Sequence, residues 1–327
     1  MSFQVISSQI AGDTTIFHIP GSSSLSDSNE PQNKPSTLLI FLPGNPGFIQ
    51  YYTHYLSLIH EALKPTTDIE VLGISHAGFE PEVGHCDKVF TLKEQVQHKI
   101  EIIEQFLNTE KQRDIWIFGH SVGCYIAQRV LSESDKDSKL RQRLKFIGLI
   151  TPTIVDIHKS AKGVRMHGVS QIVPNFNVYI SKLTYLTSML PGFALDGLVN
   201  YVVRNSTILD SFNVTKKFLT NENTVKQCLG LAIEEMREIQ DTWEYNFKFM
   251  EDFSHVQKWF FFTHPDSWVS LETQKDIETK LVNEHSKHSC IDRDDEIGHS
   301  FCIDRSVEFC EITLRRLNAL IAEVRVN

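Results

Sequence analysis

The segment that decides the fold of this chain is Trp116-Ile117-Phe118-Gly119-His120-Ser121-Val122-Gly123-Cys124-Tyr125-Ile126-Ala127. An apolar run typical of a buried strand ends at Gly119, and an amphipathic run typical of a helix follows Gly123. Strand, tight turn and helix therefore follow one another, with Ser121 at the apex. This is the Gly-x-Ser-x-Gly nucleophile elbow in the context that gives the motif its meaning.

The glycines on either side of Ser121 are what such a turn requires. The turn holds the serine in a strained backbone conformation, so the residues two before and two after it must be small. The helix that follows directs its N-terminal N–H groups and the positive end of its dipole toward the serine. The alternative is a glycine-rich strand–helix turn in which Ser121 only caps the helix.

The length and composition are those of an ordinary globular protein. The chain has 327 residues, of which 41% are hydrophobic and 22% charged, enough for one large α/β domain with insertions or for two small domains. The net charge of −9 argues against nucleic acid as the main partner, because a phosphate-binding surface needs a basic excess. The six cysteines form no CxxC pair and no zinc-like spacing. We therefore expect no cofactor, no metal ion and no nucleic acid partner.

The start of the chain does not look like a secretory signal. Residues 1–5 lack a basic n-region and are not followed by a long apolar stretch. We therefore expect an intracellular protein with reduced thiols. No window of about 18 residues is both apolar and uncharged, so we expect no ordinary transmembrane helix.

Strand and helix patterns alternate along the first part of the chain. Two short alternating runs within residues 3–19 predict a β-hairpin. Buried strands are then expected at 38–42, 69–74, 115–118 and 146–150, and helices at 51–63, 92–107 and from the elbow to about 131. This alternation predicts an α/β fold with a mostly parallel central sheet and helices on both faces.

The alternation stops at residues 156–253, which are helix-rich and aromatic. We interpret this stretch as a helical cap or lid inserted between two strands of the sheet. Strand character returns at 258–262 and, more weakly, at 288–291, with helices at 270–282 and 306–324. The predicted organisation is residues 1–155 as the N-terminal part of the core, 156–253 as the cap and 254–327 as the C-terminal part of the core.

Ser121 needs a histidine to remove its proton and a carboxylate to orient that histidine. In this fold the acid and the histidine follow the serine in that order, on loops at the carboxyl ends of strands. Asp266 lies just past the strand that ends at Phe262, and His299 lies past the last strand. We predict Asp266 as the acid and His299 as the base.

Other acids and histidines remain as alternatives. Asp156, six residues after a strand, is a rival acid, and Asp266 has an alternative role as the N-cap of the next helix. His76, on a loop at the carboxyl end of a strand, is a candidate to line the pocket. The remaining histidines near these positions are expected to pack or to be solvated: His120, His264, His285 and His288.

The oxyanion that forms on the substrate needs two preorganised N–H donors. One is expected from Val122, directly after the nucleophile. The other is expected from the loop Pro43-Gly44-Asn45-Pro46-Gly47, where Asn45 is the better donor by position and Gly44 the second choice. The alternative is a Pro/Gly turn with no part in catalysis.

Several short motifs in this chain resemble the lipid droplet-associated hydrolase family. They are Leu42-Pro43-Gly44-Asn45-Pro46-Gly47 with Tyr51-Tyr52, Ile74-Ser75-His76-Ala77-Gly78, Gln95 to Lys99, the elbow, Thr151-Pro152-Thr153 and the Asp266/Trp268 pair. Together they span almost the whole chain, and the first two are more specific than the elbow alone. The surroundings of Asp266 and His299 depart modestly from the family pattern.

The resemblance implies an α/β-hydrolase fold and a serine esterase or lipase-like activity in neutral-lipid turnover. Sterol esters and triacylglycerols are the substrates it implies, and the lipid-droplet monolayer and the cytoplasmic side of the endoplasmic reticulum are the implied location. An alternative is a protein that organises lipid droplets and whose hydrolase site is slow or vestigial. Acyl transfer or thioester hydrolysis by the same residues is a third possibility.

One segment of the insertion supports contact with lipid independently. Residues 183–195 carry no charge and are too short to span a bilayer. With residues 173–180 they suit an apolar hairpin that dips into a phospholipid monolayer. The alternative is an ordinary cap helix that covers the pocket.

Overall fold

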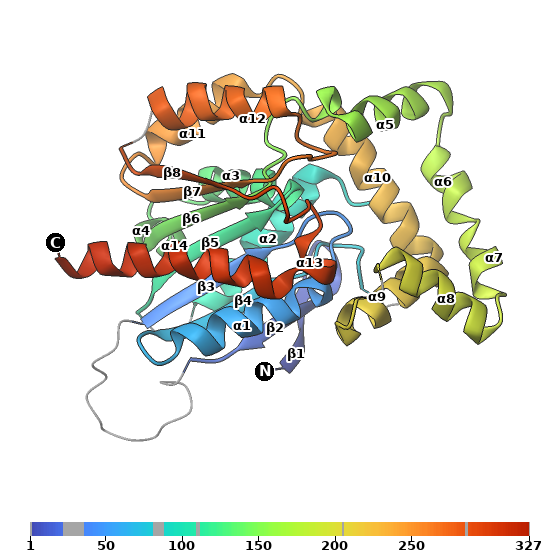
Figure 1. Cartoon of the computed structure of the whole chain (residues 1–327), viewed down its shortest axis with the longest axis horizontal. Coiled ribbons are helices and arrows are strands. Elements are labelled where there is room, and N and C mark those ends of the chain that lie inside the picture. The colour runs from blue at the N-terminus through green and yellow to red at the C-terminus, as the bar shows by residue number, and fades with distance from the viewer. Residues whose placement is uncertain are drawn as a thin grey trace.

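An eight-stranded sheet forms the centre of the protein (Figure 1). The computed structural model describes residues 2–21, 36–80, 88–108, 112–204, 206–284 and 287–326. The strand order is β1-β2-β4-β3-β5-β6-β7-β8; β1–β2 and β2–β4 pair antiparallel, and all other pairs are parallel. The strands are β1 (Ser2–Ser8), β2 (Gly12–Ile19), β3 (Ser36–Leu42), β4 (Asp68–Ile74), β5 (Asp114–His120), β6 (Leu144–Ile150), β7 (Gln257–Phe262) and β8 (Ser289–Arg293). The predicted α/β fold with a mostly parallel sheet is confirmed.

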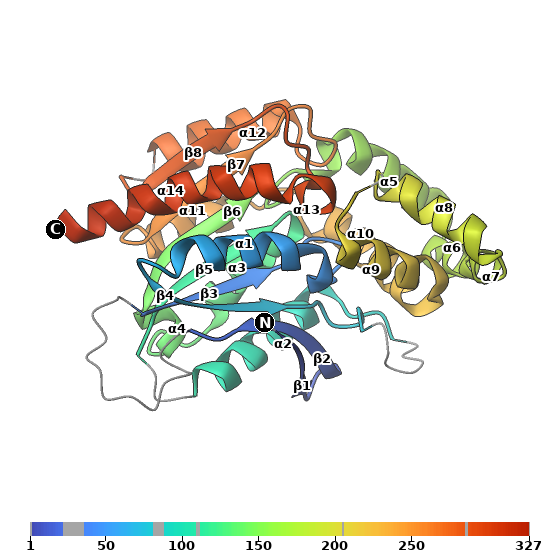
Figure 2. The same cartoon turned by 60° about the horizontal axis from the view of Figure 1, so that its bottom comes forward.

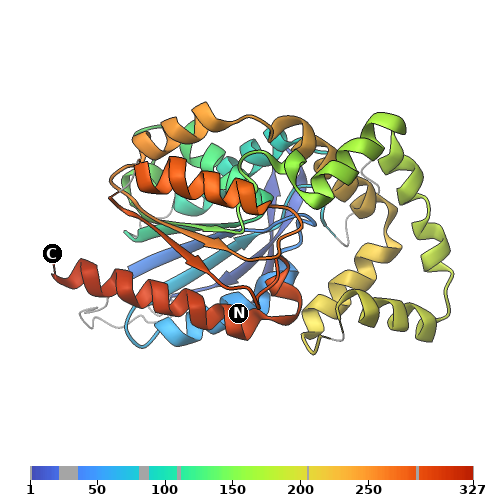
Figure 3. The ribbon, with the colours of Figure 1, turned by 45° about the horizontal axis from the view of Figure 1, so that its top comes forward.

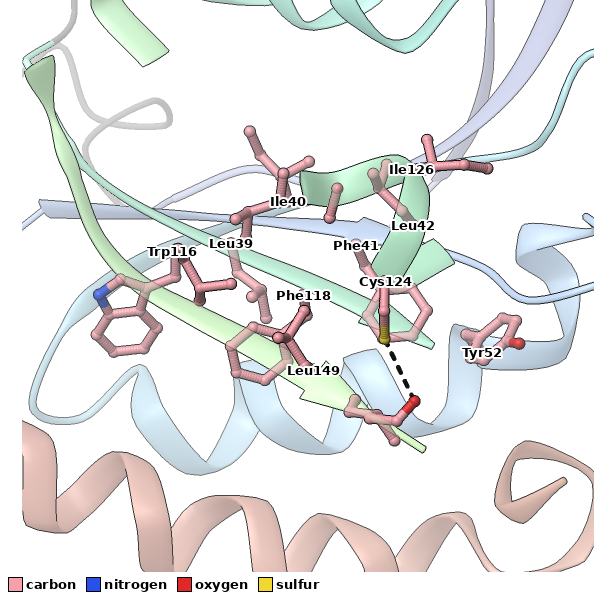
Figure 4. Packing of buried hydrophobic residues seen from close by; sticks show 14 of the residues in the cluster. Leu39, Ile40, Phe41, Leu42, Tyr52, Trp116, Phe118, Cys124, Ile126 and Leu149 are labelled. Atoms are coloured by element: carbon pink, nitrogen blue, oxygen red, sulfur yellow. Dashed lines mark hydrogen bonds between the residues drawn. The ribbon is translucent and has the colours of Figure 1, made fainter. Parts of the chain in front are cut away.

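The central strands are the apolar runs of the sequence, buried on both faces. Leu39 and Phe41 of β3 lie beside Trp116 and Phe118 of β5, with Leu149 of β6 on the other side (Figure 4). Continuous burial explains why these strands are rich in large apolar residues and do not alternate with polar ones. The core built on these strands fixes the carboxyl ends of β3, β5, β6 and β7. The loops that carry Asn45, Ser121, Asp156 and Asp266 begin there.

Helices cover both faces of the sheet (Figure 2). Helices α1 and α14 pack together on one face, and α2, α3 and α11 lie on the other. A capping box at Thr91 and Glu94 defines the start of α2. These elements are a 3₁₀ turn (Ile49–Tyr52), α1 (Thr53–Leu63), α2 (Leu92–Leu107), α3 (Val122–Glu133), α11 (Trp243–Asp252) and α14 (Ser306–Val326).

Between β6 and β7 the described residues form helices, which extend beyond the carboxyl end of the sheet (Figure 3). The last of them, α11, packs on the core: the Tyr245 hydroxyl donates to the Gln128 carbonyl of α3 at 3.1 Å. The others are a 3₁₀ turn (Ile157–Lys159), α5 (Ala161–Ile172), α6 (Phe176–Ser181), α7 (Thr184–Ser188), α8 (Gly192–Val202), α9 (Leu209–Thr220) and α10 (Glu222–Glu238).

Two segments differ from the sequence expectation. The charged stretch before β6 contains a short helix, α4 (Lys139–Gln142), because the Ser138 side chain accepts the Arg141 N–H as an N-cap. The helix expected at 270–282 is α12 (Leu271–Ile277), which continues as a π-helical segment (Glu278–Asn283). The remaining helix is α13 (Phe301–Asp304). In the part of the chain that the structure describes, no helix combines the length and apolarity that crossing a membrane requires.

Candidate active site

Ser121 stands on the sharp turn that the glycine spacing predicts. Its backbone has φ 53° and ψ −122°, a strained conformation for a residue other than glycine. A Cβ on Gly119 would overlap the carbonyl oxygen of Gly123, and a Cβ on Gly123 would overlap that of Leu42. The turn therefore depends on both glycines, and α3 begins directly after the serine.

Ser121, His299 and Asp266 form one chain of hydrogen bonds. The Oγ of Ser121 lies 3.0 Å from Nε2 of His299, and Nδ1 of His299 lies 2.8 Å from Oδ2 of Asp266. An ionised carboxylate only accepts, so Nδ1 of His299 carries a proton and Nε2 is free to accept the serine hydroxyl. The structure thus brings together the three residues predicted from loops almost 180 positions apart.

The surroundings of Asp266 keep it ionised. Burial raises the pKa of this carboxyl, but His299 and the backbone N–H groups of Trp268 and Val269 outweigh burial and hold the pKa below its ordinary value. Asp266 does not cap α12, because Ser270 takes that role. The carboxylate is available to orient His299 and to stabilise its charged form.

The Pro43–Gly47 loop lies against the elbow. A Cβ on Gly44 would come within 3.2 Å of the Ser121 Cβ, so the loop backbone passes directly beside the serine. The Gly44 N–H donates to the Tyr52 hydroxyl at 3.0 Å and is therefore already engaged. Of the two donors expected from this loop, Asn45 is the better one. Val122 opens α3, where the first N–H groups have no partner within the helix.

His120 connects the Ile49–Tyr52 turn to the loop that carries His299. Its Nδ1 accepts the Tyr52 hydroxyl at 2.7 Å, and its Nε2–H donates to the His299 carbonyl at 2.8 Å. Burial, and then the charge of His299, lower the pKa of His120 to about 3, so it stays neutral. It packs beside the serine, as expected from the sequence. Both of its ring nitrogens bond to other groups, so His120 does not act as the base for Ser121 Oγ.

The alternative residues lie elsewhere. Asp156 pairs with Lys159 at 2.9 Å. His76 is fully buried behind Gly47 and is absent from the lining of the cavity at Ser121, so the expectation that it lines the pocket is wrong. His264 is exposed and His288 contacts Gln257. His285 lies outside the described residues.

A cavity of about 270 Å³ opens at Ser121 between the sheet and the helices that lie between β6 and β7. Its walls are mostly apolar, as in sites for small organic ligands. It is lined by Asn45, Pro46, Tyr51, Tyr52, His120, Ser121, Met166, Val202, Thr215, Phe218, Leu219, Cys228, Leu229, Ala232, Glu235, Trp268, His299, Ser300, Cys302 and Ile303. Among the described residues, no group of three His, Cys, Asp or Glu could hold a metal ion.

Sequence reasoning missed Glu235, whose carboxyl lines this cavity and is only 4% exposed. Burial raises its pKa to about 8, and a hydrogen bond from Asn45 opposes that rise. Its position was visible in the sequence, because it lies four residues after Leu231 on the buried face of α10. A carboxyl on the apolar face of an amphipathic helix is the signal that could have found it.

Solved structures similar to this chain share its fold. A peroxisomal α/β-hydrolase of Saccharomyces cerevisiae matches with a TM-score of 0.65 and 12% identity, covering 95% of this chain and 82% of that one. A thermophilic esterase of Thermogutta terrifontis matches with a TM-score of 0.57 and 13% identity, covering 98% and 99%. At these identities the likeness establishes the α/β-hydrolase fold and nothing further.

A family model identifies the family, and sequence relatives carry the same name. A lipid droplet-associated hydrolase of Gallus gallus is 26% identical over 223 residues, or 64% of this chain and 65% of that protein. The aligned part covers 41% of the Drosophila melanogaster protein of the same name and 86% of the Mus musculus one, which is 22% identical over 306 residues. The family model described as lipid-droplet associated hydrolase matches residues 35–302. The chain belongs to the lipid-droplet associated hydrolase family.

Proposed function

We propose that this protein is a serine hydrolase that cleaves carboxylic esters of neutral lipids, such as sterol esters or triacylglycerols. The observation that carries the proposal is the hydrogen-bonded chain Ser121–His299–Asp266 on a strained elbow, open to an apolar cavity. The family name and the esterase fold of its structural neighbours support the same reaction class.

The proposed reaction starts with proton transfer from Ser121 to Nε2 of His299. The serine oxygen attacks the ester carbonyl, and Asp266 stabilises the imidazolium that forms. His299 then gives the proton to the departing alcohol, leaving an acyl group on Ser121. Water, deprotonated by His299, attacks the acyl-enzyme and releases the carboxylic acid.

The negative charge that develops on the carbonyl oxygen needs fixed donors near Ser121. We assign these to the backbone N–H groups of Val122 and Asn45. The positive end of the α3 dipole adds to their effect, because the helix begins at the attacking residue.

A groove on the cap suits an acyl chain. It has a volume of about 480 Å³, its walls are mainly apolar with Lys162 and Arg165 among the lining residues, and it shares Met166 and Trp268 with the cavity at Ser121. The cavity alone is small for a neutral lipid. We propose that one acyl chain reaches Ser121 along this groove, past Met166 and Trp268.

The outer cap helices suit attachment to a lipid surface. Ile172, Phe193 and Tyr201 are 80%, 82% and 81% exposed, although large apolar side chains on a protein surface normally bury more of their area. We propose that residues 156–253 act as a cap whose α5–α8 side rests on the lipid-droplet monolayer, on the cytoplasmic side of the endoplasmic reticulum and the droplets derived from it. This widens the attachment surface expected from residues 183–195.

Labelling with a fluorophosphonate probe tests the proposed reaction. Wild-type protein should be labelled at Ser121 and should hydrolyse a long-chain ester, and Ser121→Ala should lose both. The exposed apolar cap favours one rival, a droplet-organising protein with a slow or vestigial site. That rival is supported if wild type resists the probe and Ser121→Ala retains the effect on droplets.

A further inference from the structure

Helix α10 places a carboxyl group in a position that ordinary packing does not explain. Its buried face carries Gln227, Leu231 and Glu235, and Glu235 is 4% exposed. Carboxyl groups are rarely so buried without a charged partner, because removing them from water is costly. Within the described residues Glu235 has no ion pair, and its side-chain partner is the amide of Asn45.

Asn45 joins the loop beside Ser121 to this helix. Its side-chain Nδ2 donates to the Glu235 Oε1 at 3.0 Å and to the Cys228 carbonyl at 2.9 Å. Both amide protons are therefore used on α10, 190 and 183 residues further along the chain. The backbone of the same Asn45 supplies one of the proposed oxyanion donors.

We propose that Glu235 is a positioning residue that fixes Asn45 against the cap and so aims the Asn45 N–H at the oxyanion. The inference rests on the proposed function. It assigns to α10 a part in the reaction, because the oxyanion site is complete only when this helix lies against the Pro43–Gly47 loop.

The charge state of Glu235 fits this role. Burial raises its pKa to about 8, so the group is neutral at pH 7 and does not repel a developing oxyanion in the same cavity. The other titratable groups facing it stay uncharged through pH 8: the pKa of Cys228 is raised to about 12 and that of His120 lowered to about 3, both mainly by burial. Burial raises the pKa of Tyr51, Tyr52 and Cys302 as well. His299, the proposed base, lines the same cavity.

Steady-state kinetics on a soluble short-chain nitrophenyl ester test the proposal. Glu235→Leu keeps the volume but leaves an Asn45 amide proton unpaired, so kcat should fall about tenfold with KM within about twofold, as expected when a transition-state donor is misplaced. Glu235→Gln restores the acceptor and should recover most of the lost kcat. Glu238→Leu, the same substitution at an exposed site of α10, is the matched control.

The pH profile gives a second readout that a purely structural role would not move. In wild type, kcat should fall above pH 8 as Glu235 ionises, and in Glu235→Gln this alkaline limb should be absent. Equal kcat in wild type and Glu235→Leu, or an alkaline limb that survives in Glu235→Gln, overturns the inference. Failure of wild type to react with the fluorophosphonate probe would instead overturn the proposed function.

Discussion

The carboxyl end of the sheet and the outer cap helices follow opposite rules. Around Ser121 several polar groups are buried and hydrogen-bonded to one another, as in the link from Gly44 through Tyr52 to His120. Along α5–α8 large apolar side chains face outward, and Phe193 is 82% exposed compared with 8% for Ser121. The first region has the preorganised polar groups that the proposed reaction needs, and the second has the exposed apolar surface that the proposed lipid contact needs. Helix α10 contacts both, through Asn45 on one side and α6 on the other.

The largest effect is expected from breaking the first region alone. Asp266→Asn and His299→Ala should each lower kcat about 10⁴-fold, because the serine loses a correctly oriented base. Ester hydrolysis and fluorophosphonate labelling would measure the loss. Binding to artificial droplets should match wild type, since α5–α8 are untouched. A parallel loss of droplet binding would show that the two regions are not separate.

A pH-dependent stability is expected where the two regions meet. Glu235 has a folded pKa near 8 and an ordinary value near 4.5, so the unfolded chain holds fewer protons between these values. The free energy of unfolding should therefore fall as pH rises from 4.5 to 8, by at most about 1.4 kcal/mol per pH unit. Glu235→Gln should lack this slope.

Urea unfolding at pH 4.5, 6 and 8 measures the difference. Wild type and Glu235→Gln should be similarly stable at pH 4.5, and the variant should be the more stable at pH 8. The exposed Glu238→Gln is the matched control and should follow wild type. Parallel curves for wild type and Glu235→Gln would show that burial does not raise the pKa of Glu235.

The sequence was sufficient for the first region because strand order determines it. Ser121 and Asp266 each follow a recognisable apolar run and His299 follows a weaker strand pattern, and parallel strands bring their carboxyl ends to one edge. The sequence was insufficient for contacts between cap and core. The Asn45–Glu235 hydrogen bond depends on how α10, which lies 190 residues further along the chain, packs against the core. No local sequence pattern encodes that packing. His76 was misplaced for the same reason: its position at a strand end suggested the pocket, but Gly47 lets it pack behind the loop.

A change in lipid attachment is the next largest expected effect. Phe193→Ser with Leu186→Ser removes two exposed apolar side chains, and droplet binding should weaken about tenfold or more, because each such residue contributes roughly 1 kcal/mol or more when buried in lipid. Deleting residues 183–195 should release the protein from droplets and leave the sheet folded. Val307→Ser, at an exposed site on α14, is the control for a general loss of surface apolarity. Unchanged flotation of the deletion variant would place the attachment elsewhere.

The smallest expected effect concerns the link between the two loops at Ser121. Tyr52→Phe removes the hydroxyl that accepts the Gly44 N–H and donates to Nδ1 of His120. Two buried polar groups lose their partner, so the free energy of unfolding should fall by about 1–3 kcal/mol and kcat by about threefold to tenfold. Tyr55→Phe is the matched control, because it removes an equally buried hydroxyl that bonds Thr313 at 3.0 Å, away from the cavity. If both variants lose stability but only Tyr52→Phe loses kcat, the hydroxyl of Tyr52 contributes to the geometry at Ser121. Equal losses of kcat in the two variants would show that this hydroxyl only stabilises the core.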